Sequence, residues 1–248
     1  MLSLDNHQSI VAVHGSASSS KQWLSLHAAA APDYQVVAPT VPDADPKARL
    51  DVVMNAIANS ATPVHLIAHS FGASIAMMAA KTAPERVASV TLYDPVVPVK
   101  VGAEMSAPPD LRDLALVMQL AGAEHGMALF IEFWAGAKAW SGGTDKFRAA
   151  VIAKYGSVLR DFEQVASGVW NPHQIKYNGP MTILHGQESP SVILETTGFL
   201  QRVYPHAWLI PVAGLNHMTP LVASQLTDEL FLNAIEVSRI GQLDQVAA

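Results

Sequence analysis

The chain has 248 residues, half of them hydrophobic and 15% charged, which is the composition of a single domain with a large buried core. A net charge of −6 without any Lys/Arg cluster argues against a nucleic-acid surface, and with no cysteine the chain forms neither a disulfide nor a thiolate metal site. No basic-then-apolar leader opens the sequence, and no uninterrupted apolar run reaches the roughly 18 residues of a membrane span. We therefore expect a cytoplasmic protein with no nucleic-acid or membrane partner.

Short apolar segments, each followed by a helical pattern, make up the first part of the chain. Strands are expected at residues 9–13, 34–38, 64–68 and 87–92, and helices at 19–31, 46–60 and 71–83. Pro46 stands at the first position of its helix, where proline is tolerated. Strands that alternate with helices of this length predict right-handed β-α-β units and a parallel sheet.

The same alternation returns late in the chain, after a long stretch that lacks it. Strands are expected at 181–184 and 208–211, and helices at 192–203 and 221–237. Between the two halves the sequence shows no strand pattern, only helical patterns at 111–121, 124–135, 145–155 and 158–169. We therefore expect an α/β core formed by residues 1–97 and 178–248, with residues 98–177 inserted as a helical cap.

The stretch around Ser70 is the most informative in the sequence. An apolar strand ends at this serine and turns at once into a helix of small residues. Such a turn strains its central residue and needs small side chains two positions before and after it, which Ala68 and Gly72 supply. Ser70 can cap the helix or serve as a nucleophile. The rest of the chain favours the nucleophile.

A serine nucleophile needs a base to take its proton and donors to stabilise the oxyanion. His217 follows the last predicted strand through a glycine-containing turn and precedes the final helix, which favours a base over an ordinary loop histidine. Two backbone N–H groups should form the oxyanion hole. We expect one from Phe71, directly after Ser70, and one from Ser16, in the loop after the first strand.

The order of these features resembles the α/β-hydrolase superfamily, over nearly the whole chain: a His14-Gly15 turn, the Ser70 turn, the inserted helices and His217. Within it the chain is similar to a group of bacterial hydrolases, through the stretches Phe133-Trp134-Ala135-Gly136, Ala139-Trp140, Tyr93-Asp94-Pro95 and Asn216-His217-Met218-Thr219-Pro220. The resemblance implies the α/β-hydrolase fold. Because only eight residues precede the first strand, we expect the hairpin that most relatives carry there to be missing, which leaves about six strands, all parallel.

The resemblance also implies a carboxylate behind His217, to hold the imidazole in the right tautomer. Most relatives place it in a His-Gly-x-x-Asp loop after the penultimate strand, where this chain has serine at position 189. Asp94 follows the preceding strand, a position from which some members draw their acid, and Glu188 lies one residue out of register. We favour Asp94 over Glu188, although an aspartate before proline is also a common turn residue.

The cap should form the roof of the substrate pocket. Its larger apolar residues favour an acyl or ring-bearing substrate, although most of them should pack the cap itself: Met118, Met127, Phe130, Phe133, Trp134 and Trp140. Candidate pocket residues are Trp134, Phe133 and His14, the last of which we interpret first as a residue that orients its loop. No histidine is paired with carboxylates at metal-ligand spacing, so we expect neither a metal nor a cofactor.

The sequence thus predicts a serine hydrolase, resembling carboxylesterases, that cleaves a small apolar ester or acyl substrate through an acyl-enzyme on Ser70. His217 would act as base and then acid, and Asp94 would orient it. The same residues can also serve carbon–carbon bond hydrolysis, perhydrolysis or hydroxynitrile lyase chemistry. A ligand-binding member with a degenerate triad is the alternative outside catalysis.

Overall fold

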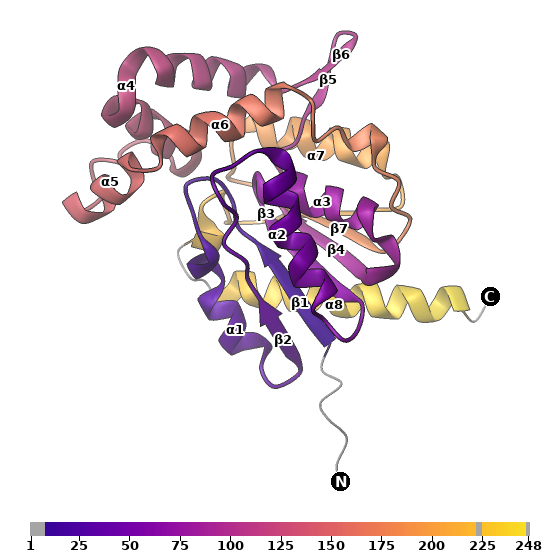
Figure 1. The fold of residues 1–248 in the computed structure, drawn as a ribbon. Coiled ribbons are helices and arrows are strands. Elements are labelled where there is room, and N and C mark those ends of the chain that lie inside the picture. The colour runs from indigo at the N-terminus through magenta and orange to yellow at the C-terminus, as the bar shows by residue number, and fades with distance from the viewer. Residues whose placement is uncertain (1–7, 222–224, 247–248) are drawn as a thin grey trace.

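The computed structural model describes residues 8–221 and 225–246, and its centre is a six-stranded sheet (Figure 1). The strands are β1 (Gln8–Val13), β2 (Tyr34–Val37), β3 (Val64–His69), β4 (Val87–Tyr93), β7 (Met181–Gly186) and β8 (Trp208–Val212). They lie in the order β2-β1-β3-β4-β7-β8, and every neighbouring pair is parallel. The predicted six-stranded parallel sheet is confirmed.

Helices cover both faces of the sheet. One face carries α1 (Leu24–Ala30) and α8 (Gln225–Val246), which pack against each other, and the opposite face carries α2 (Pro46–Ala58), α3 (Gly72–Thr82) and α7 (Ser191–Val203). Short 3-10 turns lie at Ser20–Trp23, Pro84–Arg86, Pro172–Gln174 and Thr219–Leu221. The last predicted helix was expected over 221–237; α8 begins at Gln225 and runs further, and residues 222–224 lie outside the described part.

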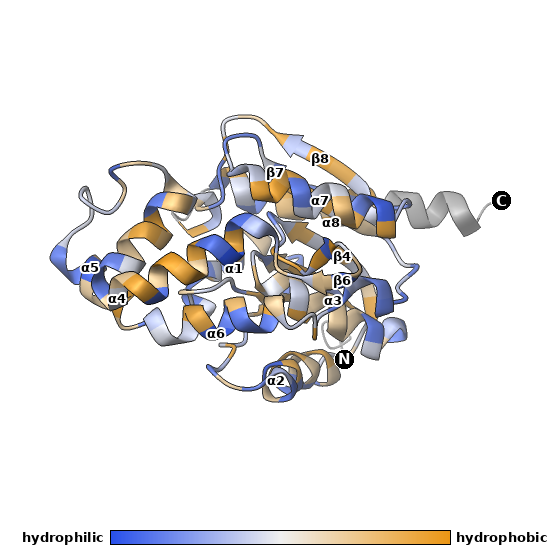
Figure 2. Ribbon diagram, turned by 90° about the horizontal axis from the view of Figure 1, so that it is seen from above, coloured by the Kyte–Doolittle hydropathy of each residue, from blue (hydrophilic) through white to orange (hydrophobic). Residues whose placement is uncertain are grey.

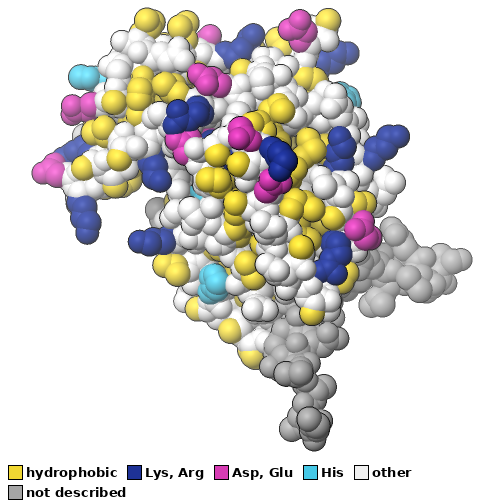
Figure 3. Space-filling model, in the orientation of Figure 1, with side chains coloured by type: hydrophobic (Ala, Val, Ile, Leu, Met, Phe, Trp, Pro, Cys, Tyr) yellow, Lys and Arg dark blue, Asp and Glu magenta, His cyan; other side chains and the backbone are white. Residues whose placement is uncertain are grey.

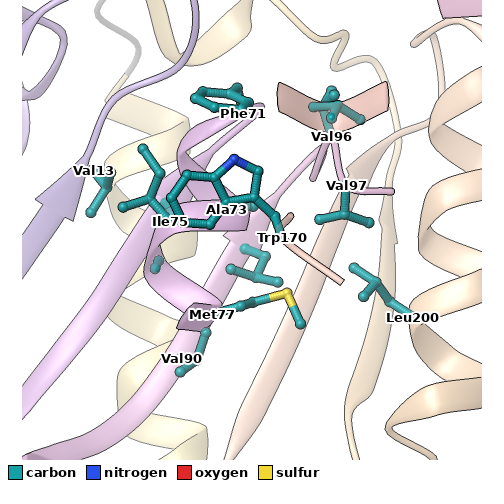
Figure 4. Packing of buried hydrophobic residues seen from close by; sticks show 14 of the residues in the cluster. Val13, Phe71, Ala73, Ile75, Met77, Val90, Val96, Val97, Trp170 and Leu200 are labelled. Atoms are coloured by element: carbon teal, nitrogen blue, oxygen red, sulfur yellow. The ribbon is translucent and has the colours of Figure 1, made fainter. Parts of the chain in front are cut away.

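The two faces have separate hydrophobic clusters because successive strand residues point to opposite sides of the sheet. Leu92 packs on the side of α2 and α3, whereas its neighbour Tyr93 packs on the side of α1 and α8. Figure 4 shows the first cluster, in which Trp170 lies beside Phe71 and Ile75 of the α3 segment. This packing fixes the start of α3 against the sheet.

Residues 98–177, which we call the inserted segment, connect β4 to β7. They contain the helices α4 (Pro109–Ala135), α5 (Asp145–Ile152) and α6 (Tyr155–Ala166). Figure 1 and the view from above in Figure 2 show these helices at one end of the molecule, each with hydrophobic and hydrophilic stretches. Their apolar residues join the core cluster on the α3 side of the sheet, so the inserted segment is packed against the core.

The expectation that this segment has no strands was wrong. A short hairpin formed by β5 (Val99–Val101) and β6 (Glu104–Ser106) opens it, with Gly102 at a φ of +62° in the turn. Strands of three residues are too short to give an alternating pattern that can be recognised in the sequence. The two predicted helices 111–121 and 124–135 are confirmed as the two parts of α4, which are separated by a kink at Gly122 (φ +75°).

Helix α4 is also, among the described residues, the one helix long and apolar enough to cross a membrane by length and composition. Its most apolar window has a mean hydropathy of 1.5, although Gln119, Glu124 and His125 interrupt the apolar run. In the fold it is interrupted at Gly122, and one side of it is buried against α6 and the core.

Candidate active site

The predicted site residues meet at the carboxyl edge of the sheet. Ser16 lies beyond β1, Ser70 directly follows β3, Asp94 directly follows β4, and His217 lies in the loop after β8. Because all the strands are parallel, these loops leave the sheet at the same edge. The fold thus brings Ser70 and His217 together, although they are 147 positions apart in the chain.

Ser70 occupies a strained turn between β3 and α3. Its φ is +56°, in the left-handed region that non-glycine residues rarely adopt. Its amide donates to the Tyr93 carbonyl (3.1 Å), and its carbonyl accepts from Ala73 at the start of the helix. Gly72 permits the close approach of α3 to the β1 loop, since a Cβ there would lie 2.5 Å from the carbonyl oxygen of His14. This backbone holds the Ser70 hydroxyl at the edge of the sheet.

The hydroxyl of Ser70 lies 3.0 Å from Nε2 of His217, and Nδ1 of His217 lies 3.2 Å from Oδ2 of Asp94. All three side chains are buried. The carboxylate can accept only from a protonated Nδ1, which leaves Nε2 free to accept the serine proton. The structure therefore places a hydroxyl, an imidazole and a carboxylate next to one another in the spatial order that can activate a serine.

The Asp94 carboxylate is fixed by two donors besides His217. The amide of Gly186 donates to Oδ1 (2.9 Å) and the hydroxyl of Ser189 donates to Oδ2 (2.6 Å). Ser189 is the serine that stands where most relatives were expected to carry an aspartate, so this loop contributes a donor to the carboxylate in place of the acid. Glu188, the alternative acid, is exposed, and its amide bonds to the Leu215 carbonyl.

Two rings lie against the imidazole of His217. Trp134 of α4 stacks on it with centroids 3.8 Å apart and planes inclined by 24°, and the ring of His69 lies 4.8 Å away, tilted by 43°. Burial, and then the neighbouring His217, lower the pKa of His69 well below its usual value. His69 is therefore neutral, and its Nε2–H donates to the backbone carbonyl of His217 (2.8 Å). The hydroxyl of Tyr93 holds the same loop through the Asn216 carbonyl.

The predicted oxyanion donors, Phe71 and Ser16, flank the Ser70 hydroxyl. Both residues line a small cavity together with Ser70. In the hydrogen bonds of residues 8–221 and 225–246, the backbone amides of Ser16 and Phe71 are not used as donors, so both are available to a ligand. A Cβ at Gly15 would lie 2.9 Å from the Cβ of Ser70, which shows how closely the β1 loop approaches the serine.

A cavity of about 650 Å³ opens beside Ser70 and His217, within the size range of small-molecule sites. Its apolar wall comes from the inserted segment and includes Phe130, Trp134 and Val151, and its polar wall comes from the loop that follows Ser16. Among the described residues, the charged ones in its lining are Lys21 and Lys154, and none of them is a carboxylate.

The remaining predicted pocket residues lie outside this lining. Phe133 packs edge-on against Trp134, with centroids 4.8 Å apart. His14 is nearly buried: its Nε2 accepts from the Val41 amide (3.0 Å), and its Nδ1–H donates to the Gly15 carbonyl (2.8 Å). Both bonds join His14 to backbone groups of loops, as expected for a residue that orients the β1 loop. Burial lowers the pKa of His14.

Several residues of the site carry no signal in the sequence. No local pattern linked His69 or Lys154 to the site, and Trp134, although predicted as a pocket residue, was not linked to His217, because these contacts depend on distant segments. The sequence shows Ser189 directly after Glu188. It does not show that the Ser189 hydroxyl donates to Asp94, because Asp94 lies at the end of another strand, β4. In the described part of the chain, no group of three His, Asp or Glu side chains is arranged to hold a metal ion.

Comparisons with known proteins agree with the fold. A search among curated proteins finds no match to the sequence. Similar solved structures include MenH from S. aureus (TM-score 0.71, 14% identity, 95% of this chain and 96% of that chain) and the 2-hydroxy-6-oxo-6-phenylhexa-2,4-dienoate hydrolase from Rhodococcus sp. strain RHA1 (0.69, 16%, 93% and 91%). Carboxylesterase CesB from Bacillus subtilis is also similar (0.65, 18%, 94% and 85%). At these identities the likeness concerns the fold. A model described as the alpha/beta hydrolase family matches residues 10–229, and the chain therefore belongs to the alpha/beta hydrolase family.

Proposed function

We propose that the protein is a serine hydrolase that cleaves a small carboxylic ester or related acyl compound through an acyl-enzyme. The observation that carries the proposal is the buried array from Ser70 through His217 to Asp94, with its contacts of 3.0 and 3.2 Å. A serine held on a strained turn against a histidine that is itself oriented by a carboxylate is the arrangement that activates a hydroxyl.

In this mechanism the Ser70 oxygen attacks the substrate carbonyl carbon while Nε2 of His217 takes the hydroxyl proton. The amides of Ser16 and Phe71 donate to the oxyanion that develops. His217 then gives its proton to the leaving alcohol. A water molecule, deprotonated by His217, attacks the acyl-enzyme, and His217 returns that proton to Ser70 as the carboxylic acid leaves. Asp94 stays ionised throughout and stabilises the imidazolium.

The lining of the cavity supports an apolar acyl group as the part that is recognised. Its wall from the inserted segment is aromatic and aliphatic, which suits a short acyl chain or a ring. With Lys21 and Lys154 as its charged residues, the cavity should accept neutral or anionic substrates better than cationic ones.

The intact array also supports a catalytic role over a ligand-binding member with a degenerate triad, since Asp94 supplies the carboxylate missing from position 189. Among the other reactions of this array, carbon–carbon bond hydrolysis has a parallel in the name of the structurally similar Rhodococcus hydrolase. A substrate panel that contains aryl esters of graded chain length and a ring-fission diketone would separate the two activities.

The direct test is Ser70→Ala, with Ser167→Ala as the matched control on an exposed helix end. The Ser70 variant should lose both turnover of a short-chain aryl ester and labelling by a fluorophosphonate probe, whereas the control should keep both. Persistence of turnover and labelling in Ser70→Ala would reject the proposal.

A further inference from the structure

A buried ion pair joins the core to the inserted segment close to the oxyanion donors. Arg49 of α2 donates from Nη1 to Oδ1 of Asp161 of α6, and the two residues are 112 positions apart in the chain. They are only 2% and 6% exposed, respectively. A buried pair of this kind is costly to break, because removing one partner leaves the other charge unpaired.

Each member of this pair also contacts one of the two proposed oxyanion residues. The guanidinium carbon of Arg49 lies 5.2 Å from the centroid of the Phe71 ring, within the range of a cation–π contact. Ser16 and Asp161 line the same small cavity, and the pKa of Asp161, which burial raises, is lowered in turn by Arg49 and by the Ser16 side chain. A single ion pair therefore reaches both the β1 loop and the start of α3.

Asp161 is close enough to the site for its charge to matter. It lines the small cavity that Ser16, Ser70 and Phe71 also line, where the oxyanion would form. An unbalanced carboxylate there would repel the developing negative charge, whereas the neighbouring guanidinium offsets it. Burial raises the pKa of Asp161 and the Arg49 charge opposes that rise.

Helix α6 is also joined to the loop that precedes α2, and Asp43 of that loop lies 3.6 Å from Nη2 of Arg49 as well. Arg160 of α6 donates from Nε to Asp43 (2.6 Å), and Gln164 donates to the Ala44 carbonyl (3.0 Å). Figure 3 shows acidic and basic side chains lying together over α6 and the start of α2. Arg160→Met therefore weakens the docking of the inserted segment on the core and leaves the Arg49–Asp161 contact itself in place.

We propose that Arg49 and Asp161 are positioning residues that hold the Ser16 loop and Phe71 in place for the oxyanion, and that Arg49 neutralises Asp161 so that the hole stays favourable to negative charge. The inserted segment would then set the geometry of the oxyanion hole as well as roof the cavity. That these amides form an oxyanion hole rests on the function proposed above. That Arg49 and Asp161 position the Ser16 loop and Phe71 does not depend on that function.

The experiment compares Arg49→Met, Arg49→Met with Asp161→Leu, and Arg49→Lys, with Arg160→Met as the matched control. For a short-chain aryl ester, Arg49→Met should lower kcat about 10- to 100-fold with KM within about threefold, because the lost stabilisation belongs to the transition state. The double variant should recover at least half of that loss on a logarithmic scale, since it removes the unpaired carboxylate as well. Arg49→Lys should keep most of the activity, and Arg160→Met should stay within about twofold of the wild type.

Two results would overturn the proposal: a kcat in Arg49→Met within about twofold of the wild type, or a loss in Arg160→Met as large as that in Arg49→Met. A double variant no more active than Arg49→Met would likewise reject the charge-balancing role. Amide hydrogen exchange of residues 15–18 gives a readout that does not depend on turnover, and it should speed up in Arg49→Met but not in Arg160→Met. If the wild type hydrolyses no ester, the proposed function fails, and the exchange result still decides the positioning.

Discussion

Replacing Asp94 by asparagine tests which carboxylate orients His217. The substitution keeps the shape of a fully buried side chain, and its amide oxygen can still accept one of the bonds from Gly186 and Ser189. The amide nitrogen, however, can only donate. It therefore favours the His217 tautomer with its proton on Nε2, which cannot accept the proton of Ser70.

The expected cost is about 10⁴-fold in kcat, which is about 5.5 kcal/mol of transition-state stabilisation. The assay is steady-state hydrolysis of a short-chain aryl ester, with far-UV circular dichroism and a melting curve to show that the variant folds. Glu188→Gln is the matched control. Its side chain is exposed, so kcat should stay within about twofold of the wild type.

A milder change at the Asp94 carboxylate tests the expected loss in kcat a second time. Ser189→Ala removes the 2.6 Å bond to Oδ2 but leaves the Gly186 amide and His217 in place. A hydrogen bond to a charged group contributes about 1.5–3 kcal/mol, which corresponds to a loss in kcat of about 10- to 150-fold. This loss is well below the loss expected for Asp94→Asn. An Asp94→Asn variant that keeps kcat, together with a large loss in Glu188→Gln, would refute the assignment and move the acid to the later loop.

Three further predictions concern the surroundings of the site. Trp134→Phe weakens the stack on the His217 imidazolium, and should lower kcat of ester hydrolysis about 2- to 30-fold, the range of a cation–π contact; an unchanged kcat would argue against that contact. Gly72→Ala places a Cβ 2.5 Å from the His14 carbonyl oxygen and should lower the free energy of unfolding in urea by about 1–3 kcal/mol, whereas Gly156→Ala, whose nearest neighbour is 3.7 Å away, should leave it equal or higher. Burial lowers the pKa values of His14 and His69 in the folded state, so the unfolded chain takes up protons first as the pH falls through about 6.5. Tm should therefore be constant above that pH and fall below it. A Tm that rises on acidification to about pH 5.5 would contradict this.

The strands of the sheet and their parallel arrangement could be predicted because they depend on local patterns. Apolar runs such as β3, which is buried along its whole length, and the small residues around Ser70 predict strand, turn and helix from neighbours in the chain. The short hairpin β5–β6 escaped this reasoning because three residues do not establish a period. The division of α4 into two helices was predicted, because the helical pattern stops at Gly122, where the backbone leaves helical geometry.

The sequence by itself thus determined the family, the parallel sheet and the positions of the serine and the histidine, all of which are set by segments of a few consecutive residues. Only the tertiary structure decided which carboxylate faces His217, because the ends of β4 and β7 come together through the sheet and not through the chain. The same holds for the Trp134 stack and for the Arg49–Asp161 pair, whose partners belong to different parts of the molecule. Contacts of this kind depend on how helices and loops pack over the carboxyl edge of the sheet, and a pattern of neighbouring residues in the sequence does not predict that packing.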